Sequence, residues 1–497
     1  MSMKKQTMLR YAIALLACQL TQNPVDAQAI FGSVQGSITD VTGAVMPGVR
    51  VTVRNMDTGL ALTTESNSAG VYFVGEVRPG RYQLQATAPG FAQFIQTGFT
   101  VRVEDQLRVD VKLQLGQVGE KVEINAEAPL LQTEQTTLGK VVDEQSIKQL
   151  PLSGRNAFDL VTLSPGVQKR PGASPPPATP GDAQPRISGG RTRTGEFVVD
   201  GSSITAPRRG EILTQPNLDA IQEFKVQTSG LSAEFGRTVG GVVNATLKSG
   251  TNQYHGNVFD YLENNDLNAR NFFARTVPKL AQNQFGGMVG GPVRQNRTFF
   301  FVAYEGLRIR AESNFNLTLP TPAMRNGDFS SLLGARAGAD ALGNSVLANE
   351  IFDPATTHSV AGGKLLRDPF AGNMVPASRF NIAGKRVLDL YPDPNLPGLT
   401  QNFRILKPNG NSNNRVDSRI DQRFTDRDQF SVHFSLDNQY ADVARPFPND
   451  RTGGHKSDFN RYKTASATWT RTSREKSSRG HRSLWLELRK TGSSVRE

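Results

Sequence analysis

Residues able to carry catalysis or to hold a metal ion are few in this chain, and their spacing suits neither task. The sequence contains one cysteine, Cys18, and five histidines. Zinc enzymes commonly place two histidines one helical turn apart, as in HExxH, and no such pair occurs here. Glycine-rich phosphate loops, Gly-x-Ser-x-Gly elbows and dinucleotide fingerprints are also absent. We therefore expect a protein that is not an enzyme and that uses no metal or cofactor. The histidines are His255, His358, His433, His455 and His481.

One run of charged residues has a regular spacing. Arg415, Asp417, Arg419, Asp421 and Arg423 occupy every second position. Alternate residues of a β-strand point to the same face, so these five side chains would share one face. Carboxylates interleaved with arginines in this way predict a ladder of ion pairs rather than a pair of catalytic acids.

The first 29 residues resemble an export signal. Lys4, Lys5 and Arg10 precede the short apolar run "YAIALLACQL", and Ala27-Gln28-Ala29 fits a small-x-small cleavage site. An alternative is lipidation at Cys18, after "LLA". Cleavage after Ala29 would leave a mature chain without cysteine, and therefore without disulfides.

Composition and length predict a mainly β protein of about three domains. The 497 residues include 47 glycines and 28 prolines. The net charge of +12 is concentrated in the signal and in the last 27 residues, so the body between them is nearly balanced. An exported chain with a balanced body is a poor candidate for nucleic-acid binding.

Residues 30–116 predict a β-sandwich of about seven short strands. "VRVTV", "RYQLQATA" and "LRVDVKLQ" alternate apolar and polar residues, and turn sequences such as "RPG" and "APG" separate the strands. Core packing and turns account for these residues, so no catalytic role is needed.

Residues 117–250 predict a small α+β domain. Asp143 or Ser146 could cap a short helix that ends before Pro151, and Asn156 could begin a second one. "RPGASPPPATPGDAQP" (170–185) predicts an extended or disordered excursion. In "AEFGRTVGGVVNATLKSG" (233–250), the glycines predict a tight bend and a strand pressed against another backbone.

Residues 251–472 contain longer strand-like segments. "HGNVFDYLEN", "RTFFFVAYEGLRIR", "RVDSRIDQRF", "FSVHFSLD" and "RYKTASATWTRT" alternate in polarity, and we expect six to eight strands. A lipid-facing barrel wall requires this alternation. A soluble antiparallel sheet with one wet face would show it too.

The three regions together resemble a known family. Residues 30–116 resemble the carboxypeptidase regulatory-like domain, and residues 117–250 resemble the plug of TonB-dependent outer-membrane receptors. Loop sequences such as "RNGDFS" and "DPFAGNMVPASRFN", within a long external loop at 311–415, are similar to the Oar-like branch. The plug motif is carried by Gly189, Gly190, Arg191, Asp200, Gly201, Phe235, Gly236, Gly240, Gly241 and Asn244.

The resemblance implies a fold and a set of partners. The fold would be an N-terminal β-sandwich, a small α+β plug and the first strands of an incomplete transmembrane β-barrel. We interpret Asp200 as a turn former whose side chain bonds its own backbone. The resemblance implies uptake of a large ligand (oligosaccharide, peptide or siderophore-like) across the outer membrane, driven by the TonB energy-coupling complex. The candidate TonB box is Val122, Glu123 and Ile124.

The C-terminal end of the sequence allows more than one interpretation. A barrel that encloses a plug needs about 22 strands, more than the residues after Gly250 can supply. Residues 473–497 lose the strand rhythm, which indicates a C-terminally truncated receptor with an aberrant basic tail. A natural basic tail that binds lipopolysaccharide or nucleic acid is an alternative. Other readings of the whole chain are a surface adhesion or glycan-binding protein without transport, and a non-functional remnant.

Overall fold

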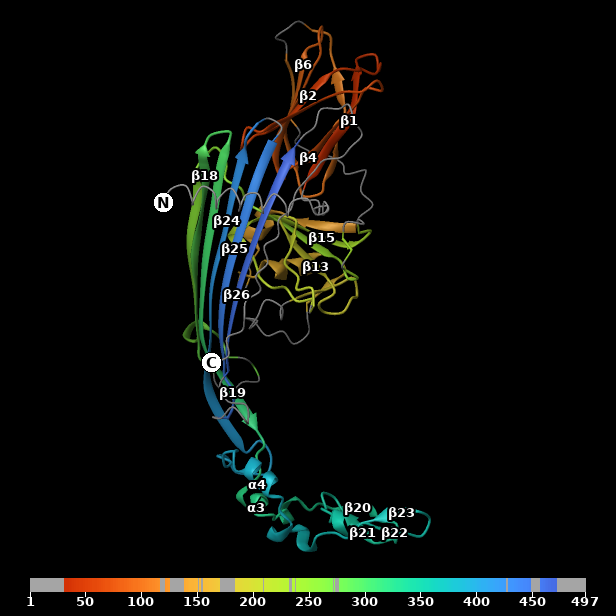
Figure 1. The fold of residues 1–497 in the computed structure, drawn as a ribbon, viewed down its shortest axis with the longest axis vertical. Coiled ribbons are helices and arrows are strands. Elements are labelled where there is room, and N and C mark those ends of the chain that lie inside the picture. The colour runs from red at the N-terminus through yellow and green to blue at the C-terminus, as the bar shows by residue number, and fades with distance from the viewer. Residues whose placement is uncertain are drawn as a thin grey trace, which may run out of the picture.

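The computed structural model describes residues 31–471 with several gaps. The gaps are 117–120, 126–137, 151, 153–154, 170–183, 209, 232–234, 237, 271, 273–276, 426–427 and 448–455. The expected signal peptide, the proline-rich segment up to residue 183 and the basic tail therefore lie outside the described residues. Figure 1 shows a tall curved sheet with a small domain against its concave side, a sandwich beyond one end and a loop domain beyond the other.

The N-terminal sandwich has two sheets. In one sheet β4 and β7 flank β1, and β8 also pairs with β1; the other has the order β3-β2-β5-β6-β9. Residues 30–116 thus contain eight strands, close to the seven expected, and β9 extends the second sheet. Tyr72 and Tyr82 are among the largest fully buried side chains. The strands are β1 (Gly32–Asp40), β2 (Arg50–Asn55), β3 (Ala61–Glu65), β4 (Val71–Val77), β5 (Gly80–Thr87), β6 (Gln93–Val101), β7 (Gln106–Arg108), β8 (Val111–Leu113) and β9 (Lys121–Asn125).

The second domain, here called the plug, is built on a five-stranded sheet of order β10-β15-β16-β13-β14. Two short helices begin at the predicted caps: the Asp143 side chain accepts a hydrogen bond from the Ser146 N–H, and Asn156 accepts one from the Phe158 N–H. The elements are β10 (Leu138–Val142), α2 (Glu144–Gln149), η2 (Ala157–Leu163), β11 (Val167–Gln168), β12 (Arg186–Ile187), β13 (Glu196–Val199), β14 (Ser202–Ser203), η4 (Leu218–Ala220), β15 (Ile221–Ser229) and β16 (Val242–Leu247).

The curved sheet, here called the wall, has six antiparallel strands in the order β17-β18-β19-β24-β25-β26. It confirms each of the strand-like segments named from the sequence. It stays open, because the first and last strands lie at opposite edges. The strands are β17 (His255–Asn264), β18 (Leu280–Arg294), β19 (Thr298–Leu317), β24 (Phe403–Arg423), β25 (Asp428–Val443) and β26 (Lys456–Arg471).

The two ends of the wall differ. At the sandwich end, only three residues (295–297) separate β18 from β19 and only four (424–427) separate β24 from β25 in the sequence. At the opposite end the separations are longer: 265–279, 318–402 and 444–455. Short turns on one side and long loops on the other are typical of outer-membrane barrels, whose long loops are external. Among the described helices, none is long and apolar enough to cross a membrane.

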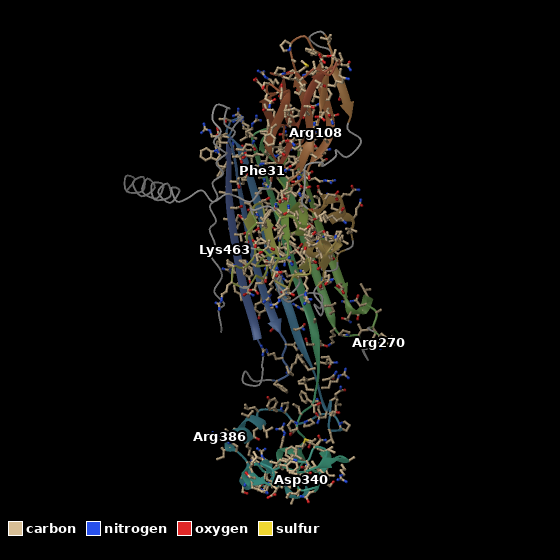
Figure 2. All side chains as sticks on the ribbon, turned by 90° about the vertical axis from the view of Figure 1, so that its right-hand side faces the viewer. Phe31, Arg108, Arg270, Asp340, Arg386 and Lys463 are labelled. Carbon is tan, nitrogen blue, oxygen red and sulfur yellow. The ribbon has the colours of Figure 1, made fainter. Side chains whose placement is uncertain are left out.

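The longest loop is shorter than the expected 311–415, because β19 and β24 continue as strands to Leu317 and from Phe403. The Asn402 amide closes its base by bonding both backbone groups of Leu319 at 2.8 and 2.9 Å. In Figure 2, Asp340 and Arg386 lie on this loop, at the other end of the molecule from Arg108 on the sandwich. Its elements are α3 (Pro322–Arg325), η6 (Ser330–Leu332), β20 (Arg336–Ala339), β21 (Ser345–Leu347), η7 (Pro354–Thr356), β22 (His358–Val360), β23 (Lys364–Leu366), η8 (Ala371–Asn373), η9 (Ala377–Arg379) and α4 (Ile382–Leu388).

Candidate functional site at the junction of plug, wall and sandwich

Glycines of the predicted motif allow close backbone approaches inside the plug. A Cβ added to Gly190 would lie 3.3 Å from Gly240 Cα and 3.0 Å from Ile187 O. Gly241 has φ +135°, and a Cβ there would lie 2.6 Å from Gln227 O. These contacts confirm the expectation that the last plug strand is pressed against another backbone.

The remaining motif residues have more varied surroundings. Gly189 and Gly201 adopt positive φ of 69° and 78°. Phe235 is buried with Val198 and Val242. Arg191 and Gly236 are exposed, and Gly236 has open space where a side chain would go. Gly236 therefore does not need to be glycine for packing.

Asp200 has a different role from the one expected. Its backbone is left-handed, with φ 45°, as suits a turn. Its carboxylate, however, accepts a hydrogen bond from the Leu247 N–H at 3.1 Å and lies 3.3 Å from the Arg419 guanidinium. The expectation that the side chain bonds its own turn was wrong, because the wall supplies a cation at this point.

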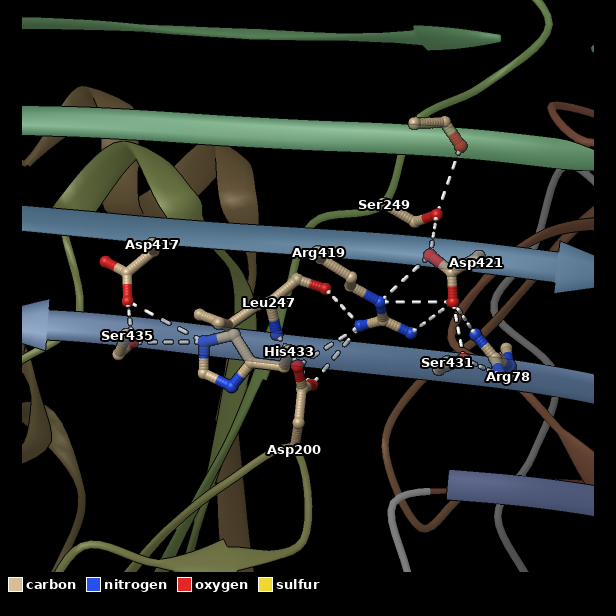
Figure 3. A network of polar contacts seen from close by, with 11 residues as sticks. Arg78, Asp200, Leu247, Ser249, Asp417, Arg419, Asp421, Ser431, His433 and Ser435 are labelled. Carbon is tan, nitrogen blue, oxygen red and sulfur yellow. Dashed lines mark hydrogen bonds and ion pairs between the residues drawn. The ribbon is translucent and has the colours of Figure 1, made fainter. Parts of the chain in front are cut away.

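Arg419 and Asp421 on β24 form the centre of a polar network (Figure 3). The Arg419 guanidinium donates to Leu247 O at 2.9 Å and pairs with Asp421 at 3.0 Å. Asp421 also accepts hydrogen bonds from Ser249 of the plug at 2.6 Å and from Ser431 of β25 at 2.6 Å. Both charges are buried and fully partnered, which is the condition under which buried charges are tolerated.

The same strand contacts the plug at further points along its length. Asp417 accepts a hydrogen bond from the Asn217 N–H at 2.8 Å. Arg415 pairs with Asp437 of β25 at 3.5 Å and with Glu305 of β19 at 3.4 Å. The predicted ladder is confirmed in part: Arg419 pairs with Asp421 within it, Arg415 pairs instead with carboxylates on the neighbouring strands, and Asp417, Arg419 and Asp421 also bind the plug.

A second cation reaches the wall from the plug side. Arg155 pairs with Asp219 at 2.7 Å and lies 3.7 Å from Glu305 of β19. Its guanidinium also stacks over Phe259 of β17, 4.1 Å from the ring centre. A cleft of about 600 Å³ opens beside it, between α2 and strands β17 and β18, with Glu144, Lys148 and Lys248 among its lining residues. Polar contacts thus hold the plug, together with an apolar cluster that includes Phe301 and Ala303 of β19, and a cleft lies next to them.

The sandwich also contacts both of the other parts, which the sequence did not reveal. Arg78, in the turn between β4 and β5, pairs with Asp421 at 2.5 Å. Glu104, in the turn between β6 and β7, accepts a hydrogen bond from the Asn244 side chain at 2.7 Å. No local signal marks these residues, since each partner is more than a hundred positions away.

One buried carboxyl of this contact has a perturbed acidity. Glu223 on β15 accepts a hydrogen bond from the Val103 N–H of the sandwich. Burial raises the pKa of the Glu223 carboxyl from 4.5 to about 7, the Val103 hydrogen bond opposes the rise, and the nearby charge of Asp105 adds to it.

The candidate TonB box lies in β9. Residues 121–125 pair in parallel with β6, with Val122 opposite Phe94 and Ile124 opposite Gln96. This places Val122, Glu123 and Ile124 at the edge of the second sandwich sheet. Glu120 and Ala126, which flank them in the quoted stretch, lie outside the described residues.

The outer face of the wall is apolar. Along β25 the polar Ser431, His433 and Ser435 are buried toward the plug, while Phe434 points outward. Outward-facing apolar side chains on every strand form a band that suits lipid contact. Its members include Val258, Leu262, Val289, Val302, Ile420, Phe434 and Trp469. Within the described residues, no group of three or more His, Cys, Asp or Glu side chains could hold a metal ion.

Two protein-family models match the chain. The model of an outer membrane beta barrel domain matches residues 246–479, and that of a carboxypeptidase regulatory-like domain matches residues 33–114. The first covers the wall and the second the sandwich.

The proteins to which this chain is similar include transporters and receptors. The TonB-dependent transporter Oar of Myxococcus xanthus is 29% identical over 259 residues, which span 49% of this chain and 23% of Oar. The chain thus spans about a quarter of that relative. Solved structures include the outer membrane transporter YddB from Escherichia coli (11% identity, TM-score 0.41, 68% of this chain and 37% of that chain) and the siderophore receptor PirA from Acinetobacter baumannii (16%, 0.39, 68% and 38%).

Proposed function

We propose that this chain serves in TonB-dependent uptake across the outer membrane, because it is similar to the TonB-dependent transporter Oar and matches a carboxypeptidase regulatory-like domain followed by an outer membrane β-barrel domain. In this role the plug blocks the lumen behind the wall, and energy from the inner membrane displaces it. The protein binds and moves its ligand without chemical conversion.

The observation that carries the proposal is the polar ladder between wall and plug. Asn217, Asp200 and Ser249 of the plug each bond a charged residue of β24. Polar contacts can be exchanged for water when two surfaces separate, at a far smaller net cost than their strength in isolation. An apolar interface of the same extent would resist wetting. The ladder therefore suits a plug that must be bound firmly to the wall and still be able to move away from it.

The ligand belongs to a class too large for diffusion through porins. Oligosaccharide, peptide and siderophore-like molecules all fit this description. Residues 318–402 form a large surface at the external end of the wall, and we propose that ligand capture begins there.

Coupling to TonB is proposed at β9. Edge strands bind partner chains by strand addition, with main-chain hydrogen bonds supplying affinity. Val122, Glu123 and Ile124 lie on such an edge, so TonB could pair with this strand or pull it away from β6.

Site-directed cross-linking in cells tests this coupling. A photo-reactive amino acid at Val122 should give an adduct with TonB, and the same group at Lys112, exposed on β8, should not. Equal adducts at both positions, or none at Val122, would contradict coupling at β9.

A further inference from the structure

The turn between β6 and β7 of the sandwich holds Glu104 in an unusual conformation. Glu104 has φ 56°, which is a left-handed backbone conformation. This conformation costs energy for most residues, less for asparagine and least for glycine. The turn is braced on both sides: the Asp105 carboxylate accepts a hydrogen bond from the Arg102 N–H at 3.0 Å, and Asp105 O accepts one from the Ser33 N–H at 2.7 Å.

The Glu104 side chain reaches into the middle of the plug sheet. Its carboxylate accepts hydrogen bonds from the side-chain amides of Asn244 on β16 and Gln227 on β15. It also lies 3.5 Å from the ammonium group of Lys225 on β15. Asn244, Gln227 and Lys225 are all at most 4% exposed. One carboxylate therefore joins two neighbouring strands at the same level.

The sandwich is attached to the wall as well. Arg78 pairs with Asp421 and donates to Ser431, on neighbouring wall strands. The Asp57 carbonyl accepts a hydrogen bond from the Asn252 N–H at 2.9 Å, where the chain leaves the plug for the wall. Asp421 also bonds Ser249 of the plug, so all three parts meet at this one residue.

We propose that the sandwich is a latch on the plug: Glu104 fixes strands β15 and β16, and Arg78 fixes the sandwich to the wall. The plug cannot then shift in the lumen unless the sandwich shifts with it or lets go. This proposal rests on the proposed function, because a latch matters only for a plug that moves.

The latch gives β16 attachments to both of the other parts. The Asn244 side chain bonds Glu104 of the sandwich, and the Leu247 carbonyl oxygen accepts a hydrogen bond from Arg419 of the wall. Loss of the Glu104 carboxylate would take one acceptor away from the two buried amides and the buried ammonium group of its partners. Water would enter to satisfy them, and the plug sheet would open more often.

A buried thiol in the plug can measure this opening. Thr246 on β16 is 4% exposed, and its hydroxyl has no hydrogen-bond partner within the described structure, so Thr246→Cys fits there with little disturbance. Combined with Cys18→Ser, it leaves one thiol in the full chain. The rate of its reaction with a water-soluble maleimide, in purified outer membranes, reports how often β16 becomes accessible.

The test variant is Glu104→Asn. Asparagine accepts the left-handed backbone but is too short to reach the plug. We expect the thiol to react at least about tenfold faster in this variant, as the loss of charge-assisted hydrogen bonds implies. Glu65→Asn, at an exposed position on β3, is the matched control and should leave the rate unchanged.

A second variant separates release of the latch from unfolding of the sandwich. Arg78→Gln frees the wall attachment without touching the Glu104 turn, and it should also raise the rate. Hydrogen exchange of β1 and β5 should stay slow in both variants. An unchanged rate in both, or a faster rate only where the sandwich strands lose protection, would overturn the latch. The assay needs neither ligand nor TonB. Its result can therefore be interpreted even if experiments show that the protein does not carry out TonB-dependent uptake.

Discussion

At the scale of single residues, Glu223 makes the stability of the plug depend on pH. Its pKa is raised from 4.5 to about 7 in the folded protein, so between these values the folded chain holds a proton that the unfolded chain has released. Stability then falls as the pH rises through this window and levels off above it. Arg102, which opposes the shift, and Asp143, which adds to it, are the other charged groups that act on it.

We expect the urea midpoint of unfolding to fall between pH 5 and pH 8 by more in the parent chain than in Glu223→Gln. Other groups titrate equally in both proteins, so the difference between the two profiles isolates Glu223. Identical profiles would show that this carboxyl is not perturbed.

Arg419 offers a prediction about a buried charge. Arg419→Met leaves both Asp200 and Asp421 buried without their main cation, and breaking a buried pair in this way typically costs about 3–5 kcal/mol. Urea unfolding should show a loss of this size. Arg404→Met, on the same strand but at the loop end, should have little effect. Adding Asp200→Asn to Arg419→Met should restore part of the loss, since it removes one stranded charge.

At the scale of elements, substitutions of two glycines in the same motif should differ in their effect on stability. Gly241→Ala would place a Cβ 2.4 Å from Ile187 Cγ2 on a backbone with φ +135°, and we expect a loss of about 2 kcal/mol or more in unfolding free energy. Gly236→Ala meets open space and should be nearly neutral. Equal effects would mean that the close approach of the strands in the plug is relaxed in solution.

The helix caps and the wall strands could be predicted from the sequence, because local sequence patterns determine them. Asp143 and Asn156 cap helices where capping residues were expected, and the wall strands follow the alternation of polarity. The hydrogen-bond partner of the Asp200 side chain was predicted wrongly, because Arg419 is distant in the chain and no local sequence feature indicates the contact. Glu104 and Arg78 were missed for the same reason. The loop was drawn too long because its composition, rich in glycine, proline and asparagine, hid the short alternating runs "NFNL" (314–317) and "FRI" (403–405), which extend β19 and β24.

At the scale of the whole molecule, the wall should meet lipid along its outer face. The chain has two tryptophans, and Trp469 on β26 is 45% exposed on that face. With Trp485→Phe, the emission of Trp469 should be strongly quenched by brominated lipids and weakly by iodide in water. The reverse pattern would contradict membrane insertion of β26.

The loop at 318–402 has a further consequence for how this protein can change. Asn402 clips its base together, and the amide of Asn373 ties its interior by bonding Phe329 O, Asn349 O and the Ile351 N–H. A segment with a closed base and its own internal hydrogen bonds can keep its structure independently of the strands that carry it. Such a segment could be exchanged for another of different sequence while the strands beneath it stayed the same.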